Sequence, residues 1–83
     1  MLANDMKKGQ LIKMRNGWLA TIADNKKGNI RLVEEDFDDD LGYPISIWDI
    51  AVYWDGFYNA WLTLELSDSQ KAARDDEEVY LGI

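Results

Sequence analysis

Apolar and polar residues alternate in three short segments near the start of the chain. In the first, Ile12 and Met14 are separated and followed by the charged residues Lys13 and Arg15. A two-residue period of this kind is typical of a strand with one buried face. The alternation recurs in the next two segments, which end near Glu34. The pattern therefore predicts three short strands that form an antiparallel meander.

Turn residues separate these three segments. Asn16-Gly17 is a strong hairpin signal, because both central positions of a type I′ turn take positive φ. The second turn is the polar stretch 24–28, which ends in Gly28. Glycines at such short intervals argue against a helix in this part of the chain.

A second hairpin is predicted in residues 51–66, around Asp55-Gly56. If these two residues form the loop, Trp54 lies opposite Phe57, and both faces of the hairpin are apolar near the turn. Three explanations are open: the loop is longer, a bulge shifts the register, or one aromatic face is left uncovered.

The only good helix candidate follows this hairpin. Ser67 and Gln70 have the spacing of a capping box, in which each side chain accepts a hydrogen bond from the other residue's backbone. The next residues are strong helix formers. A run of four acidic residues then opposes the helix dipole, so we expect the helix to end near Asp75 or Asp76.

Six of the seven residues in 34–40 are acidic. Asp36, Asp38 and Asp40 alternate, and carboxylates are the ligands that calcium prefers. The central glycine and distal glutamate of a calcium-binding loop do not fit this segment. A solvated loop before the next strand, residues 45–48, is the main interpretation, and a cation site is the alternative.

Length and composition exclude several classes of protein. Eighty-three residues predict one domain, and the chain has no cysteine and no histidine. Disulfides and thiolate metal sites are therefore excluded, and the commonest general base is missing. No apolar run approaches the ~20 residues of a membrane helix.

Residues 1–8 lack the apolar core of a signal peptide, and we expect them to form a flexible terminus of a cytoplasmic protein.

The net charge of −7 conceals an asymmetry along the chain. Residues 1–33 carry seven basic and two acidic side chains, a net of +5, whereas residues 34–83 carry two basic and fourteen acidic ones, a net of −12. The main interpretation is a solvated surface on which the two halves compensate. The alternatives are contact of the basic turns with phosphate, or of the acidic face with a basic partner.

Aromatic residues are concentrated in the second hairpin and just before it. Fourteen consecutive positions contain six of them: Trp48, Tyr53, Trp54, Phe57, Tyr58 and Trp61. Exposed apolar patches usually mark interfaces, where tryptophan and tyrosine are favoured. The alternatives are that the aromatic residues fill the core or pack against the C-terminal helix, or that they bind a foreign ligand such as nucleic-acid bases or a proline-rich peptide.

A set of turn and strand motifs carries a resemblance to a known architecture. These motifs are residues 9–14, 16–22, 24–25, 28–31 and 48–50. Together they resemble small SH3-like β-barrels, including the KOW type, and the chain is similar to short proteins of marine bacteria and their phages. Such barrels have many roles, so the resemblance implies architecture rather than activity. A KOW-type role implies contact with RNA or the ribosome through a basic surface.

We therefore predict an all-β protein with one SH3-like domain. A barrel of about five strands and an added hairpin would occupy residues 9–66, and a short helix and tail would occupy residues 67–83. We expect a noncatalytic, cofactor-free protein-interaction module that forms a homodimer through its aromatic hairpin. The candidate partner-binding residues are Tyr53, Trp54, Phe57, Tyr58 and Trp61.

Two alternative functions remain open from the sequence. One is nucleic-acid contact through the basic N-terminal hairpins, for which the candidate residues are Lys13, Arg15, Lys26, Lys27 and Arg31. The other is an acidic inhibitor that mimics nucleic acid. Added salt separates phosphate binding from aromatic burial, because only phosphate binding weakens steeply with salt.

Overall fold

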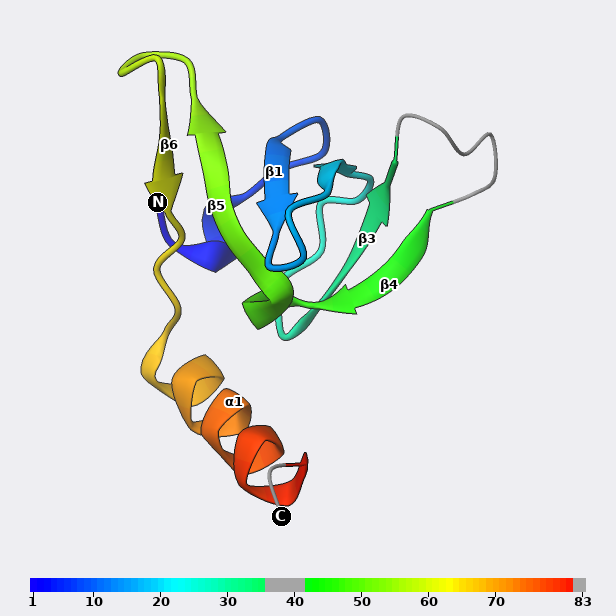
Figure 1. Ribbon diagram of the computed structural model, residues 1–83, viewed down its shortest axis with the longest axis vertical. Coiled ribbons are helices and arrows are strands. Elements are labelled where there is room, and N and C mark those ends of the chain that lie inside the picture. The colour runs from blue at the N-terminus through cyan, green and yellow to red at the C-terminus, as the bar shows by residue number, and fades with distance from the viewer. Residues whose placement is uncertain (36–41, 82–83) are drawn as a thin grey trace.

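Antiparallel strands form a single sheet in the computed structural model, which describes residues 1–35 and 42–81 (Figure 1). The six strands in these ranges are β1 (Leu11–Met14), β2 (Leu19–Ile22), β3 (Ile30–Glu34), β4 (Tyr43–Ser46), β5 (Ile50–Asp55) and β6 (Ala60–Thr63). Two 3₁₀ turns, η1 (Ala3–Asp5) and η2 (Ile47–Asp49), and the helix α1 (Asp68–Leu81) complete the fold. The predicted all-β class, with a second hairpin and one C-terminal helix, is confirmed.

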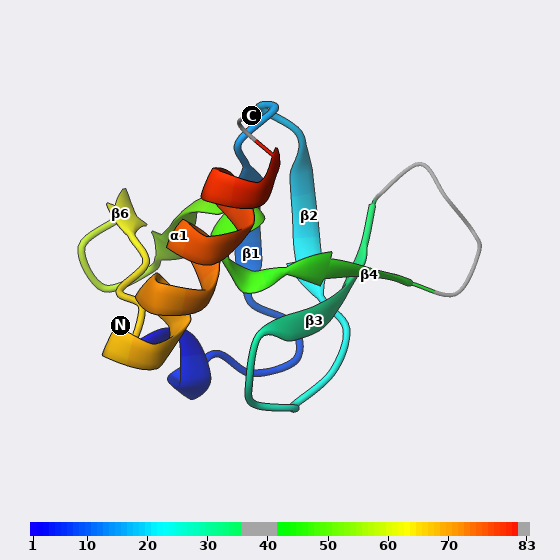
Figure 2. The same cartoon turned by 90° about the horizontal axis from the view of Figure 1, so that it is seen from below.

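The strand order is β4-β3-β2-β1-β5-β6. The first four strands form a meander, and η2 then leads the chain into β5, which pairs antiparallel with β1 on the other side of that strand. The sheet curls, with β4 running crosswise to β1 (Figures 1 and 2). An irregularity in the β1–β5 pairing places Val52 opposite Lys13 but Ile50 opposite Met14, so that Ile50 joins the core.

The core lies against one face of the sheet. In β1 and β2, Ile12, Met14, Ala20 and Ile22 are buried, and the residues between them are more exposed. The alternation predicted for these two strands is therefore confirmed. The other core residues come from the N-terminal segment, from the later strands, from η2 and from the residue after β6: Ala3, Met6, Val33, Ile45, Ile47, Ile50, Tyr53 and Leu64.

The N-terminal segment is part of this core, so the prediction of a flexible terminus in residues 1–8 is wrong. Ala3 is fully buried and Met6 nearly so. The Ala3 N–H donates to the Glu65 carbonyl at 2.8 Å, and the Glu65 N–H donates to the Met1 carbonyl at 3.0 Å. These bonds to a segment about sixty residues away fix the terminus, because they add to the burial of its two apolar side chains.

The Asn16-Gly17 turn forms where the sequence predicts it, but with a different geometry. Among the non-glycine residues of the described ranges Asn59 alone has positive φ, so Asn16 does not adopt the type I′ conformation. Gly17, at φ 90°, donates to the Met14 carbonyl at 2.9 Å, and the Met14 N–H donates to the Trp18 carbonyl at 2.8 Å. This pattern is a three-residue loop that ends in a glycine bulge.

The capping box at the start of α1 is confirmed. The Gln70 N–H donates to Ser67 Oγ at 3.2 Å, and the Ser67 N–H donates to Gln70 Oε1 at 2.9 Å. Helix α1 runs to Leu81, so the predicted end near Asp75 or Asp76 is wrong. An acid near a helix C-terminus costs only about 0.3–1 kcal/mol, which the strong helix formers in this segment offset.

Candidate functional site

The aromatic hairpin has a longer loop than the two residues expected. Asp55 pairs with Ala60 and Trp54 pairs with Trp61, so residues 56–59 form the loop. The expected pairing of Trp54 with Phe57 is therefore wrong, and the longer loop is the correct one of the three explanations. Two added loop residues move Phe57 from the strand to the tip.

Side-chain hydrogen bonds shape this tip. Asp55 Oδ1 accepts from the N–H groups of Phe57 and Tyr58, at 2.8 and 3.0 Å. Asn59 closes the loop at φ 53°, a conformation that asparagine tolerates better than most residues. Asp55 and Asn59 thus determine the conformation of the turn. In this conformation the rings of Phe57 and Tyr58 are exposed to solvent.

The two tip rings are the most exposed large hydrophobic side chains of the described residues. Phe57 is 89% exposed and Tyr58 is 68% exposed. Their rings lie edge to face, with centroids 5.2 Å apart and an interplanar angle of 89°. Burial of one such side chain contributes about 1.5–3 kcal/mol, so the tip offers a substantial gain to a partner that covers it.

A second aromatic pair lies farther down the hairpin, on the outer face of the sheet. Trp54 and Trp61 are half-buried and pack edge to face at 5.4 Å. Lys13, on the neighbouring strand β1, places its ammonium 4.9 Å from the centroid of the Trp61 ring. This cation–π contact was not predicted from the sequence. Only the pairing of β1 with the hairpin brings Lys13 close to Trp61.

Tyr53 belongs to the core and not to the exposed aromatic surface, so its assignment as a partner-binding residue is corrected. It is 5% exposed, and its hydroxyl accepts a hydrogen bond from the Met1 amino group at 3.0 Å. Burial raises the pKa of Tyr53, and the charges of Asp55 and Glu65 raise it further. We therefore define the aromatic hairpin surface as Trp54, Phe57, Tyr58 and Trp61.

Strand β6 lies at the edge of the sheet, next to this surface. It pairs with β5 on one side, and β5 separates it from the rest of the described sheet. Just beyond β6, Glu65 forms a parallel bridge with Leu2, so the N-terminal segment covers only the end of the edge. An edge strand of this kind is a template for strand pairing with another chain.

Arg31 is fully buried, so its assignment as a phosphate-contacting residue is wrong. It shares a strand face with Val33, which is also fully buried, and the guanidinium follows Val33 into the core. Burial lowers the pKa of Arg31, and the nearby carboxylate of Asp24 opposes that shift. The guanidinium donates to four acceptors, the carbonyls of Ala3, Gly28 and Ile30 and the side chain of Asn4.

The other candidate cations are distributed over the molecule. Lys13 lies over Trp61, Arg15 lines a cleft beside α1, and Lys26 and Lys27 are exposed on the loop between β2 and β3. The structure therefore does not assemble them into one basic patch.

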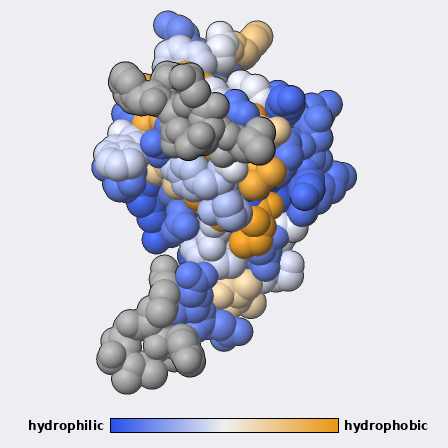
Figure 3. Space-filling view, turned by 90° about the vertical axis from the view of Figure 1, so that its right-hand side faces the viewer, coloured by the Kyte–Doolittle hydropathy of each residue, from blue (hydrophilic) through white to orange (hydrophobic). Residues whose placement is uncertain are grey.

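Figure 3 views the side that carries β3 and β4, where a small apolar area lies among hydrophilic residues.

The acidic segment gives no metal site in the part of the chain that can be described. Asp36, Asp38 and Asp40 lie outside the described residues. Within residues 1–35 and 42–81, acidic side chains form no group of three or more that could hold a metal ion. The same ranges contain no helix with the length and apolar character that crossing a membrane requires.

Comparison with known proteins identifies no relative of this chain: no family model, curated protein or solved structure matches it. The aromatic hairpin and its surroundings are therefore the basis for a functional proposal.

Proposed function

We propose that this protein is a noncatalytic protein-interaction module that self-associates through the aromatic hairpin surface. The observation that carries the proposal is the exposure of Phe57 and Tyr58, at 89% and 68%, on a loop shaped by its own hydrogen bonds. Aromatic side chains held in this way present a large contact area and lose little conformational freedom on binding.

A second copy of the chain is the partner that this geometry favours. Strand β6 provides an edge that can pair antiparallel with the same strand of another copy about a two-fold axis. Such pairing would bring two Trp54–Trp61 pairs and two aromatic tips to one interface. The 83-residue chain buries only a modest core, so assembly would also add stability.

The SH3-like resemblance is part of this proposal. It is supported by the strand order, in which a four-stranded meander is followed by a 3₁₀ turn and a strand that returns to β1. The hairpin strand β6 lies beyond that unit. We infer that the hairpin is an interaction element added to a small barrel whose own architecture implies no activity.

Light scattering during size exclusion, at about 0.1 M and about 1 M salt, tests the proposal. We expect a dimer at both concentrations, because burial of aromatic surface is insensitive to salt. The double variant with Phe57→Ser and Tyr58→Ser should be a monomer. Trp18→Ser is the matched control, since Trp18 is 60% exposed on a different turn and should leave the dimer intact.

Two results would contradict the proposal. A wild-type protein that remains a monomer at the highest soluble concentration would rule out the homodimer. A dimer that dissociates at high salt would show that charge, and not the aromatic hairpin surface, holds the copies together.

A further inference from the structure

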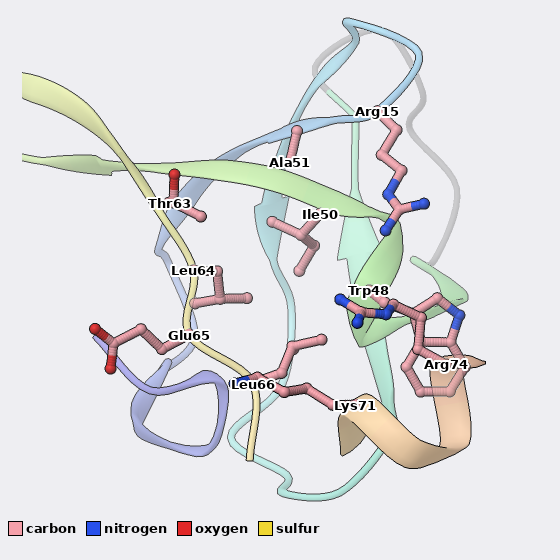
Figure 4. A pocket seen from close by; sticks show the side chains of 10 residues that line it. All are labelled: Arg15, Trp48, Ile50, Ala51, Thr63, Leu64, Glu65, Leu66, Lys71 and Arg74. Atoms are coloured by element: carbon pink, nitrogen blue, oxygen red, sulfur yellow. The ribbon is translucent and has the colours of Figure 1, made fainter. Parts of the chain in front are cut away.

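A cleft of about 540 Å³ lies between the sheet and helix α1 (Figure 4). The volume is within the range of small-molecule sites, about 300–1,000 Å³. Its lining combines apolar and cationic side chains, of which the ones that matter here are Arg15, Trp48, Leu64, Leu66, Lys71 and Arg74. None of these belongs to the aromatic hairpin surface, so binding of a ligand in the cleft does not depend on the proposed self-association.

The charge of the cleft is opposite to that of the protein. Lys71 and Arg74 are the only basic residues in 34–83, and both line the cleft because they are three positions apart on one helix face. Arg15 adds a third cation from the turn between β1 and β2. Glu65 is the one acid in the lining, which gives the cleft a net charge of +2 in a chain of net charge −7.

The two helix cations face the cleft with little competition from neighbouring carboxylates. Arg74 pairs with Asp75 at 3.1 Å, but the Asp75 side chain is 61% exposed, and exposed ion pairs are weak. Lys71 has no ion-pair partner in the described ranges. In Figure 4 the side chain of Arg15 extends from its turn toward Trp48 and Arg74, and Lys71 lies beside Leu66.

Helix α1 is fixed to η1 and to the loop between β2 and β3 at the end next to the cleft. Gln70 is 3% exposed, and its side-chain amide donates to Asn4 Oδ1 at 3.2 Å and to the Gly28 carbonyl at 3.1 Å. Lys71 is the next residue in the chain and Arg74 lies one helical turn later. Their positions relative to Trp48 are therefore set by a buried hydrogen-bond network, and the cleft is formed before any ligand binds.

We infer that this cleft binds a small phosphate monoester that carries a flat or apolar group. Ammonium and guanidinium groups on one wall suit a phosphate dianion, which accepts several charge-assisted hydrogen bonds. Trp48 offers a ring face at the edge of the cleft, and Leu64 and Leu66 provide an apolar floor for the organic part of the ligand.

Titration of ¹⁵N-labelled protein with phenyl phosphate, followed by NMR, tests this inference. We expect shifts of the Trp48 indole and of the Lys71 and Arg74 amides. The double variant with Lys71→Gln and Arg74→Gln should bind about tenfold or more weakly, since it removes the charge-assisted hydrogen bonds to the phosphate. The matched control removes two cations elsewhere, through Lys26→Gln and Lys27→Gln, and should bind as the wild type does.

Two further probes separate the parts of the inference. Inorganic phosphate should bind the same residues more weakly, because it lacks a group for Trp48, and phenol should not bind measurably. Absence of cleft shifts with phenyl phosphate would overturn the inference. Equal weakening in both pairs of variants would also overturn it, because it would show attraction to overall charge and not a site at the cleft.

Discussion

Arg31 is a charged residue that is fully buried, although charged side chains normally lie at the surface. It is the largest fully buried side chain in the described ranges, whereas its strand neighbour Ile30 is 53% exposed. Two of its four hydrogen-bond acceptors, the Ala3 carbonyl and the Asn4 side chain, come from the N-terminal segment. Its Nε is buried and has no partner within the described part of the chain. Arg31 thus links the N-terminus to the sheet.

We predict that Arg31→Ala destabilises the protein by about 3 kcal/mol, because it leaves a cavity and buried carbonyls without donors. Urea denaturation followed by circular dichroism measures this change in the free energy of unfolding. Lys27→Ala is the control, an exposed cation of the adjoining loop that should change stability by less than about 0.5 kcal/mol. Similar values for both variants would show that the guanidinium network contributes nothing.

The raised pKa of Tyr53 leads to a prediction of how the free energy of unfolding depends on pH in the alkaline range. Because burial raises its pKa above the ordinary value of 10.0, the fold favours the neutral phenol. Below pH 10 the phenol is neutral in both the folded and unfolded states, so it adds no pH dependence there. As pH rises from 10.0 towards the folded-state pKa, the unfolded chain ionises first and stability is lost.

Tyr53→Phe should therefore lose less stability than the wild type between about pH 9.5 and 11. Thermal melting at a series of pH values measures the difference between the two proteins. Titration of tyrosinate absorbance should also show that the variant lacks one step above pH 10.0 that the wild type has. If the two proteins lose stability in parallel, the pKa of Tyr53 is the same in the folded and unfolded states, which would contradict this prediction.

At the scale of single elements, helix α1 shows how local sequence sets a boundary. The Ser67–Gln70 capping box starts the helix and also directs the Gln70 amide group toward Asn4 and Gly28. One residue therefore serves the helix terminus and the attachment of the helix to η1 and to the loop between β2 and β3. The acidic residues after Arg74 are insufficient to stop the helix, because each opposes its dipole only weakly.

We predict that Ser67→Ala lowers the free energy of unfolding by about 1 kcal/mol, the typical contribution of a serine N-cap. Chemical denaturation measures the change. Ser69→Ala provides the control, because it removes only the 3.2 Å contact between the two hydroxyls and leaves both hydrogen bonds of the capping box. A larger loss than for an ordinary cap would indicate that Ser67 also maintains the contacts of Gln70. No loss would show that the capping hydrogen bonds are not formed in solution.

At the scale of the whole molecule, two surfaces with different chemistry lie on one small sheet. The aromatic hairpin surface is next to the β6 edge, and the cationic cleft lies where α1 meets the sheet (Figures 1 and 4). The first suits a protein partner and the second suits a small anion. Each can be tested alone, because they share none of the residues to be substituted.

Local patterns in the sequence were sufficient for the first three strands, the positions of the turns between them and the helix start. Alternation identifies residues that share a strand face, and turn or cap residues act on neighbours a few positions away. The exposed tip of the hairpin was predictable only in part. Phe57 and Tyr58 were candidates from composition, but the side chain of Asp55 decides the loop length that exposes them.

Only the tertiary structure decided which face of a strand is buried and which distant residues meet. Alternation placed Arg31 with Val33 but could not show that both lie inside, because two acceptors for the guanidinium come from the remote N-terminal segment. The cleft likewise joins Arg15 to Arg74 across most of the chain. The sequence determined local conformation through neighbouring residues, and long-range packing and hydrogen bonding determined the surfaces on which function depends.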